Sequence, residues 1–275
     1  MLTNIRLWIA ACRELNIAFE ILHPTQNLVR IKSNNKFYFF INYSTPFNIH
    51  SNTQLFKDKE YSYQLLKERV NIPKTRAFLS PFCAEKYQSY LNFKEIDSIL
   101  KEISKTFAIP VIIKRNAGSA GNNVFLCQDI EQVKLSLQHI FNVNSKDYDY
   151  IALAQEYIDI DYEYRAFFFN DELLLLYKKS TTGANFVGNL SPLHWKGSQA
   201  IHITEANLLA AINSFIQPIF QEITLNYAGV DIAIDKKGKY WLIEINSSPI
   251  FDLFIRDNNE KIIIEMFKKM LKSLD

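Results

Sequence analysis

Glycine is scarce in this sequence: only 7 of the 275 residues are glycine, and none precedes Gly118. Because scarce glycines tend to stand where a side chain does not fit, their positions point to constrained backbone. Cysteine is rarer still, since Cys12, Cys83 and Cys127 are too few and too widely spaced for a disulfide framework or a zinc cluster. We therefore expect reduced thiols in a cytoplasmic protein.

Long apolar runs and an excess of one charge are also lacking. No run of about 18 apolar residues occurs, so we expect no transmembrane helix, and the segment 1–15 lacks the order of a signal peptide. The formal net charge is only +2, which argues against a dedicated nucleic-acid binder. Hydrophobic residues make up 48% and charged residues 22%, as in folded proteins. We expect neither nucleic acid nor membrane among the partners.

The hydrophobic pattern predicts alternating helical and strand-rich segments. Apolar residues at helical spacing predict helices over 2–16, 57–70, 94–107, 129–142, 204–222 and about 259–273. Alternating or continuous apolar runs predict strands over 17–22, 28–32, 36–41, 108–114, 124–127, 151–158, 164–169, 172–178, 228–235 and 239–245. This order favours an α+β protein with mixed sheets. The polar stretch 179–200 has no period, and a loop of this length inside a compact domain is usually functional.

Two strands near the C-terminal end bring acidic residues together. A four-residue turn between them would pair Asp231 with Glu244, with Asn246 one step further along the same face. Directly opposed like charges destabilise a hairpin, so a proton, a basic residue or a metal must offset them. Two carboxylates and an amide oxygen suit magnesium that carries phosphate. The alternative is a solvated strand face in a register that differs by one residue.

A glycine-containing loop follows a buried strand that ends at Lys114. Backbone N–H groups around Gly118, Ser119 and Gly121 could wrap phosphate, and the lysine would supply positive charge. The pattern is neither a Walker loop nor a dinucleotide fingerprint, because a strand follows it instead of a helix. The alternative is an ordinary hairpin turn beside an exposed lysine.

Together these segments resemble the ATP-grasp superfamily, and within it the amino-acid ligases: ribosomal-protein glutamate ligases, glutathione synthetases and cyanophycin synthetases. The resemblance extends from about Asn52 to Pro249, with the motifs in family order. The matching segments are FKDKEYSYQLLKERVNIPKT, IPVIIKRNAGSAGNNV, QEYI, EYR, KKSTTGANFVGN, AGVDIAID and IEINSSP. Three positions depart from the family pattern: Arg115 stands where proline or leucine usually follows the lysine, Val187 stands where arginine is usual, and Ile250 stands where glycine follows the proline.

The resemblance implies roles for individual residues. The residues implied in catalysis are Arg165, Lys178 and Asn189, and the implied metal ligands are Asp231, Glu244 and Asn246. The residues implied in ATP binding are Lys59, Lys114, Gly118, Ser119 and Gly121 for phosphate, Gln155, Glu156, Tyr157 and Ile158 for adenine, and Glu163 for ribose. The loop 179–200 would close over the site and exclude water. His194, Trp195 and Lys196 lie in this loop, where substrate contact and simple packing are both open.

The resemblance also implies an architecture of two α+β lobes that grip ATP, preceded by a short α/β lobe. The expected division has a short N-terminal lobe over 1–52 and a linker and helical segment over 53–107. The small lobe with the phosphate loop follows over 108–158, and the large lobe with the metal site over 159–275.

The activity implied is ATP-dependent and magnesium-dependent joining of a carboxylic acid to an amine through an acyl phosphate. Two magnesium ions are expected, with manganese as a substitute. The substrates would be a small-molecule or peptide carboxylate and an amine, on an amino acid, a peptide or a protein, and a homo-oligomer is left open. Two alternatives stay open, because fold does not settle function: a small-molecule kinase and a non-catalytic nucleotide-binding protein.

Overall fold

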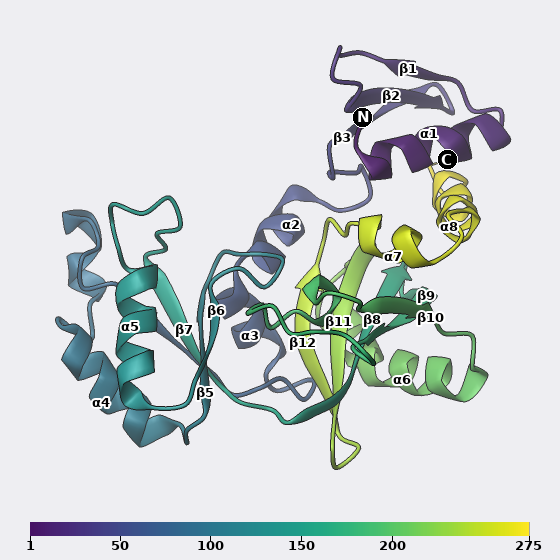
Figure 1. The fold of residues 1–275 in the computed structure, drawn as a ribbon. Coiled ribbons are helices and arrows are strands. Elements are labelled where there is room, and N and C mark those ends of the chain that lie inside the picture. Colours follow the sequence, from purple (N-terminus) through teal and green to yellow (C-terminus); the bar gives the residue numbers. More distant parts are fainter. Residues whose placement is uncertain (275) are drawn as a thin grey trace.

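The computed structural model describes residues 1–274, which form a short N-terminal unit and two lobes built on antiparallel sheets (Figure 1). The N-terminal helix lies beside the C-terminal helix, so segments from both ends of the chain are neighbours. None of the helices within residues 1–274 has the length and apolar character that a membrane span requires. The α+β fold expected from the sequence is confirmed.

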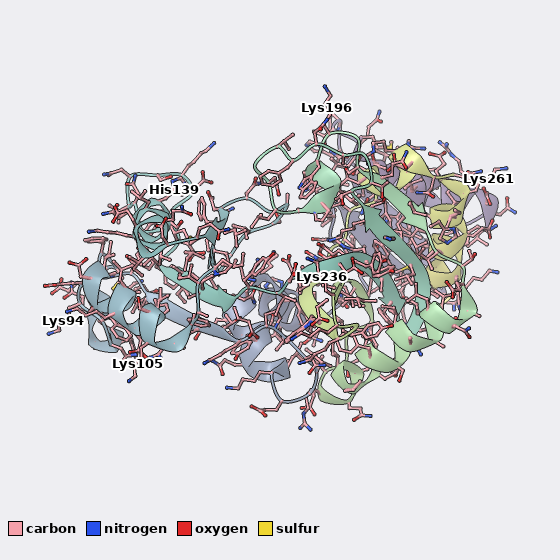
Figure 2. The ribbon with its side chains drawn as sticks, turned by 60° about the horizontal axis from the view of Figure 1, so that its bottom comes forward. Lys94, Lys105, His139, Lys196, Lys236 and Lys261 are labelled. Atoms are coloured by element: carbon pink, nitrogen blue, oxygen red, sulfur yellow. The ribbon has the colours of Figure 1, made fainter. Side chains whose placement is uncertain are left out.

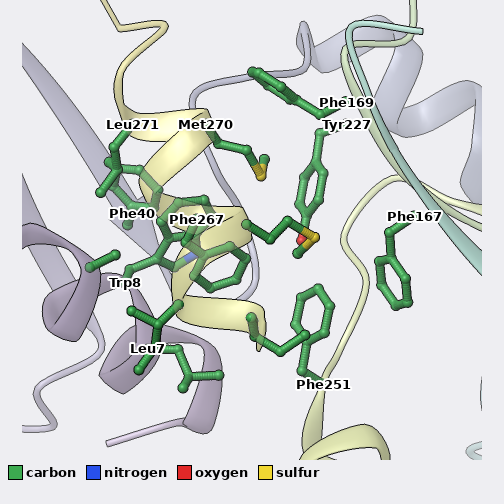
Figure 3. Packing of buried hydrophobic residues seen from close by; sticks show 14 of the residues in the cluster. Leu7, Trp8, Phe40, Phe167, Phe169, Tyr227, Phe251, Phe267, Met270 and Leu271 are labelled. Carbon is green, nitrogen blue, oxygen red and sulfur yellow. The ribbon is translucent and has the colours of Figure 1, made fainter. Parts of the chain in front are cut away.

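The N-terminal unit is a three-stranded sheet with one helix against its inner face. Its elements are α1 (Thr3–Glu14), β1 (Phe19–Ile21), β2 (Leu28–Ser33) and β3 (Lys36–Ile41), in the strand order β1-β2-β3. Figure 3 shows Trp8 of α1 against Phe267 near the C-terminal end, and their stacked ring centroids lie 3.5 Å apart. The same hydrophobic cluster includes Phe167 and Tyr227 of the large lobe. The unit therefore shares a core with that lobe.

Two helices, α2 (His50–Lys57) and α3 (Lys59–Leu66), connect this unit to the lobes. The sequence pattern predicted one helix over 57–70, but the helices meet at Asp58, whose backbone is extended. The Asp58 side chain accepts a hydrogen bond from the Tyr61 backbone N–H at 2.9 Å, which caps α3. Lys59 is thereby placed in the first turn of a helix.

The small lobe is a four-stranded sheet with two helices packed on one face. Its elements are β4 (Thr75–Leu79), a short 3-10 helix (Glu85–Tyr90), α4 (Ile96–Thr106), β5 (Val111–Arg115), β6 (Val124–Cys127), α5 (Ile130–Ile140) and β7 (Ile151–Glu156). The strand order is β4-β7-β5-β6. The segment 53–107, expected to be a linker and helical segment, thus supplies an edge strand and a covering helix to this lobe. It does so because α4 and α5 share the hydrophobic cluster beneath the sheet.

The large lobe is a five-stranded antiparallel sheet in the order β10-β9-β8-β11-β12. Its elements are β8 (Ile160–Phe169), β9 (Glu172–Ser180), a 3-10 turn (Pro192–His194), β10 (Gln199–His202), α6 (Ala206–Glu222), β11 (Tyr227–Asp235), β12 (Tyr240–Asn246), α7 (Asp252–Asp257) and α8 (Lys261–Leu271). Asn170 and Asp171 both have positive φ and form the two-residue turn predicted between β8 and β9. Helix α6 covers one face, where the ring centroids of Phe168 and Phe220 lie 5.3 Å apart.

The opposite face of this sheet has an apolar half and a polar half. In the apolar half, Phe167 stacks on Phe251, which precedes α7, with ring centroids 4.6 Å apart (Figure 3). Tyr177 packs near Phe254 of α7 in the same cluster. The polar half, further along the same strands, carries the charged residues described below.

Replacing Trp8 tests whether the N-terminal unit and the large lobe share one core. Trp8→Ala should lower the free energy of unfolding by about 3–5 kcal/mol, because it removes a buried indole and leaves a cavity. Tyr90→Ala is the control, since Tyr90 is 71% exposed and should change stability by about 0.5 kcal/mol or less. Urea unfolding followed by circular dichroism measures both, and equal midpoints would contradict a shared core.

Candidate active site

Charged side chains gather on the polar half of the large sheet, on the face opposite α6, which we call the site face. Asp231 of β11 pairs with Arg165 of β8, and Arg165 pairs with Tyr177 of β9. Because side chains alternate along a strand, Glu163 and Arg165 share this face with Lys179. Three neighbouring strands therefore converge on one group of charges.

Four side chains form a buried charge network on the site face: Glu163, Arg165, Lys179 and Asp231. Arg165 donates from Nε and Nη2 to the two carboxylate oxygens of Asp231, at 2.5 and 2.6 Å. Lys179 Nζ lies 2.8 Å from Asp231 Oδ1 and also donates to Glu163. The side chains of Lys179 and Asp231 are only 4% and 6% exposed. Because these side chains are shielded from water, the bidentate pair of Arg165 and Asp231 is strong and fixes the geometry of both residues.

The network favours the charged forms of Asp231 and Lys179. Burial alone would raise the pKa of Asp231, but Arg165 and Lys179 outweigh it and hold that pKa below its usual value. Burial also opposes the charge on Lys179, yet Asp231 and Glu163 raise the pKa of Lys179. Burial raises the pKa of the Glu163 carboxyl group in spite of its contact with Lys179. Removing Lys179 would leave the Glu163 carboxyl group without its partner, and removing Arg165 would leave Asp231 Oδ2 without a donor.

A β-bulge in β9 decides which lysine reaches the site face. The register set by the two-residue turn would bring Lys178 to this face. The register shifts by one residue partway along the hairpin, so Lys178 pairs with Tyr164 and faces the α6 side. There its ammonium group lies 3.9 Å from the ring centroid of Tyr162. The sequence placed Lys178 in the site, and the structure corrects that position to Lys179.

A second bulge, between β11 and β12, brings Glu244 to the site face. Tyr240 and Leu242 pack in the hydrophobic cluster beneath α6, because Ile234 pairs with Tyr240. The four-residue turn assumed from the sequence is therefore wrong. The register then shifts by one residue, and Asp231 pairs with Glu244 as predicted. An extra residue in β12 restores the pairing that the wrong turn had suggested.

Gly229 allows Arg165 to lie across β11. It pairs with Asn246 on one side and Phe167 on the other. A Cβ atom at Gly229 would lie 2.9 Å from the Pro249 Cβ and 3.3 Å from the Arg165 Cδ. A side chain here would push the guanidinium group away from Asp231, which explains the glycine in the AGVD segment by close approach.

The donor atoms at this end of the sheet fit a hard divalent cation. The Asp231 carboxylate accepts from three donors and offers about four acceptor positions. The Glu244 carboxylate is 25% exposed, and its nearest cation is Lys59 Nζ at 3.3 Å. The Asn246 amide nitrogen is buried without a hydrogen-bond partner within residues 1–274, and turning the amide over would present its oxygen instead. Two carboxylates and an amide suit Mg²⁺.

Such an ion would depend on ligands beyond the protein's acidic residues. Within the part of the chain that the structure describes, no group of three His, Cys, Asp or Glu residues is arranged to hold a metal. The amide of Asn246 and oxygens of a bound phosphate would have to complete the coordination. This is how Mg²⁺ is usually bound at phosphate-transfer sites, with few carboxylates.

The small lobe contributes Lys114 and Gln155. Lys114 Nζ donates to Gln155 Oε1 at 2.9 Å, and Gln155 Nε2 donates to Thr75 Oγ1 at 2.8 Å. Burial and the nearby charge of Lys59 lower the pKa of Lys114 to about 8, although Glu244 opposes them. A cavity of ≈ 20 Å³, with room for about one water molecule, is lined by residues of both lobes at this point. The two lobes therefore meet where these side chains lie.

The loop 116–123 is fastened at its base. Asn116 Oδ1 accepts a hydrogen bond from the Glu60 backbone N–H at 2.9 Å, and Asp149 Oδ2 accepts from the Ala117 N–H at 2.7 Å. Lys59 Nζ donates to the Gly118 carbonyl oxygen at 2.6 Å. The first turn of α3 thus holds the loop beside Glu244. Ser119, further along the loop, is exposed.

The tip of the same loop contacts the long loop 179–200. Asn189 Nδ2 donates to the Ala120 carbonyl oxygen at 2.9 Å, and Trp195 Nε1 donates to the Asn189 carbonyl oxygen at 2.6 Å. Gly121 has a φ of +69°, and a Cβ there would lie 2.2 Å from Asn189 Oδ1. Asn189 therefore joins the two loops, and Gly121 is required for the contact. Figure 2 shows Lys196 of the long loop pointing outward, away from the rest of the protein.

The segment predicted to hold adenine follows β7 at the junction of the lobes. Glu156 Oε1 accepts a hydrogen bond from the Lys74 backbone N–H at 2.6 Å, so this side chain has a structural partner. Tyr157 is 41% exposed, and Ile158 is half-buried. Among these residues, Gln155 alone places its side chain beside Lys114.

Four residues that hold the site together were not found from the sequence: Thr75, Asn116, Asp149 and Lys179. Asn116 lies inside the glycine-containing loop, so the sequence could have identified it as a candidate site residue by its position. Thr75 and Asp149 act through partners on distant segments, and no local pattern marks such contacts. Lys179 was adjacent to the residue chosen, and only the bulge separates the two.

This arrangement is that of an ATP-grasp protein, in which two lobes hold ATP between them. The model of the RimK-like ATP-grasp domain family matches residues 57–274. The chain therefore belongs to the RimK-like ATP-grasp family.

Individual proteins resemble this chain in sequence or in fold. The uncharacterized protein MG012 of Mycoplasma genitalium is 24% identical over 217 residues, which cover 77% of this chain and 68% of MG012. A bifunctional glutathione synthetase from Pasteurella multocida has a TM-score of 0.58 and 14% identity over 98% of this chain and 43% of its own. A D-alanine–D-alanine ligase from Bacillus anthracis has a TM-score of 0.52 and 19% identity over 79% of this chain and 65% of its own. The chain thus spans less than two thirds of either solved protein, and the likeness is one of fold.

ATP binding should take up protons near pH 8 if Lys114 contacts phosphate. The pKa of Lys114 is about 8, so above this pH the amine is mostly neutral in the free protein. A bound phosphate would raise that pKa, so affinity should fall as the pH rises from 7 to 9. Calorimetry in buffers of different ionisation enthalpy measures the proton uptake. Lys114→Gln should bind ATP more weakly and without proton uptake. If this variant took up the same number of protons, the proton would bind to another group.

Replacing Lys178 or Lys179 of β9 by methionine, an apolar residue of similar length, should change the free energy of unfolding by very different amounts. Lys179→Met leaves two buried carboxylates with one cation fewer and should cost about 3–5 kcal/mol of unfolding free energy. Lys178→Met loses only a contact with an exposed tyrosine ring and should cost about 1 kcal/mol or less. Urea unfolding at pH 7 compares the two. A larger loss for Lys178→Met would show that the register of β9 described here is incorrect.

Proposed function

We propose that the protein is an ATP-dependent and magnesium-dependent carboxylate–amine ligase, which forms an amide bond through an acyl phosphate. The observation that carries the proposal is the set of charges around the meeting point of the two lobes. Its cations are Lys59, Lys114, Arg165 and Lys179, and its carboxylates are Glu163, Asp231 and Glu244. The set is net positive, so it favours a polyanion such as a nucleotide triphosphate.

The proposed chemistry requires little covalent work from the protein. A carboxylate oxygen of the acid attacks the terminal phosphorus of ATP, ADP leaves, and an acyl phosphate forms. An amine then attacks the carbonyl carbon, and phosphate leaves. The protein aligns the reactants and stabilises the charge that moves between them. Mg²⁺ at Asp231, Glu244 and Asn246 would neutralise phosphate oxygens when bound.

Each step of this chemistry then has candidate residues in this chain. Lys59 and Lys114 are proposed to contact phosphate, together with backbone groups around Gly118, Ser119 and Gly121. Arg165 and Lys179 are proposed to stabilise the transferred phosphoryl group or the acid, since both carry their charge into a buried site. Asn189 is proposed to act by holding the long loop against the loop 116–123.

The acid substrate is proposed to differ from the glutamate used in the branch that this sequence resembles. Val187 stands where that branch has arginine, and its side chain is 56% exposed. Lys178 faces the α6 side and Lys196 points outward, so neither supplies the missing charge. Lys179 and Arg165 remain as the cations for the acid, and both are held beside Asp231.

Trapping with hydroxylamine tests the reaction type. Each of the twenty amino acids is supplied as the acid with ATP, Mg²⁺ and hydroxylamine, because hydroxylamine converts an acyl phosphate into a hydroxamate. We expect at least one acid to stimulate ADP release and to give its hydroxamate in equal amount. Glu244→Gln should reduce both by about a hundredfold or more, as expected when the charge that holds Mg²⁺ is lost.

A stable phosphate ester as the product would contradict the ligase proposal. A kinase would release ADP with a hydroxyl compound and leave a stable phosphate ester. Such an ester, without hydroxamate from any acid that stimulates ADP release, would replace the ligase proposal with a kinase.

A further inference from the structure

His194 is a titratable group beside the site that the proposed function does not use. It ends the 3-10 turn Pro192–His194 in the long loop. Leu193, immediately before it, is 3% exposed and packs in the core cluster of the apolar half. Trp195, immediately after it, is fastened to Asn189 by its indole N–H. The backbone at His194 is therefore held between two anchored neighbours.

The charged groups that act on the His194 ring are three cations from three different elements. They are Lys179 of β9, Arg165 of β8 and Arg256 of α7. Partial burial and these three cations lower the pKa of His194 below its usual value. This lowered pKa favours the neutral imidazole at pH 7, which has a lone pair available.

The carboxylates beside these three cations are bound to the cations themselves. Asp231 and Glu163 hold Lys179, and Asp257 holds Arg256 and the Ala200 backbone N–H. Within residues 1–274, neither ring nitrogen of His194 has a hydrogen-bond partner, and the side chain is exposed. The ring is thus a free base that opens toward solvent next to the buried network.

We propose that His194 is the general base that removes a proton from the incoming amine in the second half of the reaction. The proposal rests on the ligase function proposed above. An amine arrives in water as an ammonium ion, which has no lone pair with which to attack. A neutral, solvent-exposed imidazole near the cations of the site is a group that can remove that proton.

The proton balance of this step is complete. A ring nitrogen of His194 takes one proton from the ammonium group, and the neutral amine attacks the carbonyl carbon of the acyl phosphate. The C–N bond forms, the C–O bond to phosphate breaks, and the second proton leaves the nitrogen with the departing phosphate. His194 then returns its proton to solvent. The three cations favour this return, because they disfavour an imidazolium and an ammonium ion alike.

The other bases near the lobes are poorly suited to this task. His202 packs edge-on against Phe254, with ring centroids 5.9 Å apart. His139 lies on α5 of the small lobe and contacts Asn123 (Figure 2). Lys114 is buried and donates to Gln155. Each has a partner or a location that removes it from the path of an amine, whereas His194 has neither.

Hydroxylamine and ammonia, two nucleophiles of similar size, distinguish an effect of His194 on the amine from an effect on the formation of the acyl phosphate. Hydroxylamine is already neutral at pH 7, whereas ammonia is almost entirely ammonium. Any acid that yields a hydroxamate with the unchanged protein is tested with each nucleophile, using the full chain, ATP and Mg²⁺. His194→Asn should keep hydroxamate formation within about twofold. It should lower primary-amide formation from ammonium at pH 7 by about a hundredfold or more, the usual contribution of a general base.

The pH profile and a second histidine complete the test. Amide formation by His194→Asn should recover as the pH rises to 9, because ammonia then loses its own proton. His202→Asn is the matched control and should leave both products unchanged.

Three results would overturn the proposal. Parallel loss of hydroxamate and amide would mean that His194 positions the loop, and loss of neither would remove it from the reaction. Hydroxamate without any primary amide in the unchanged protein would show that no base acts on ammonium there. Failure of the ligase function itself is distinguishable, because the unchanged protein would then give no hydroxamate with any acid.

Discussion

The buried contact of Asp231 with Arg165 and Lys179 is the interaction on which the rest of the site depends. Removing these charges from water is costly, and the cost is offset only while each carboxylate oxygen keeps its donor. The three residues come from three neighbouring strands, so the contact fixes the register of all three at once. A buried ion pair often contributes little to net stability, which suggests that this one is present for what it positions. It holds two cations and a carboxylate ready beside the meeting point of the lobes.

The site is built on the same face of the sheet as a large hydrophobic cluster. The apolar half of that face packs against α7, α8 and the N-terminal unit, with the rings of Trp8 and Phe267 in contact. Gly229 lies between the halves, where Pro249 and Arg165 both approach its backbone closely. The charged side chains therefore extend from strands that are already held rigidly. The N-terminal unit thus packs on the apolar half of the face that carries the site.

The sequence was sufficient for the α+β fold and for the pairing of the two acidic residues, and the failures have local physical causes. Asp231 and Glu244 were correctly paired, and the turn at Asn170–Asp171 was correctly placed. The two bulges were missed because period two is unreadable where both faces of a strand are apolar, as in the runs ELLLLYK and YWLIEI. The bulge in β9 places Lys179 on the site face where Lys178 was predicted. The bulge in β12 restores the pairing of Asp231 with Glu244, although the turn predicted between β11 and β12 was wrong. Asp58 likewise divided one expected helix into two, since a cap can interrupt an apolar pattern without changing its period.

Transfer of oxygen from the acid to phosphate tests the central claim most directly. The acid is labelled with oxygen-18 in its carboxylate, and the inorganic phosphate formed with ATP and an amine is analysed by mass. An acyl phosphate requires that the oxygen which attacks ATP leaves with phosphate, so each phosphate should carry one labelled oxygen. Unlabelled phosphate during amide formation would contradict the account, because the carboxylate would then have been activated without accepting a phosphoryl group.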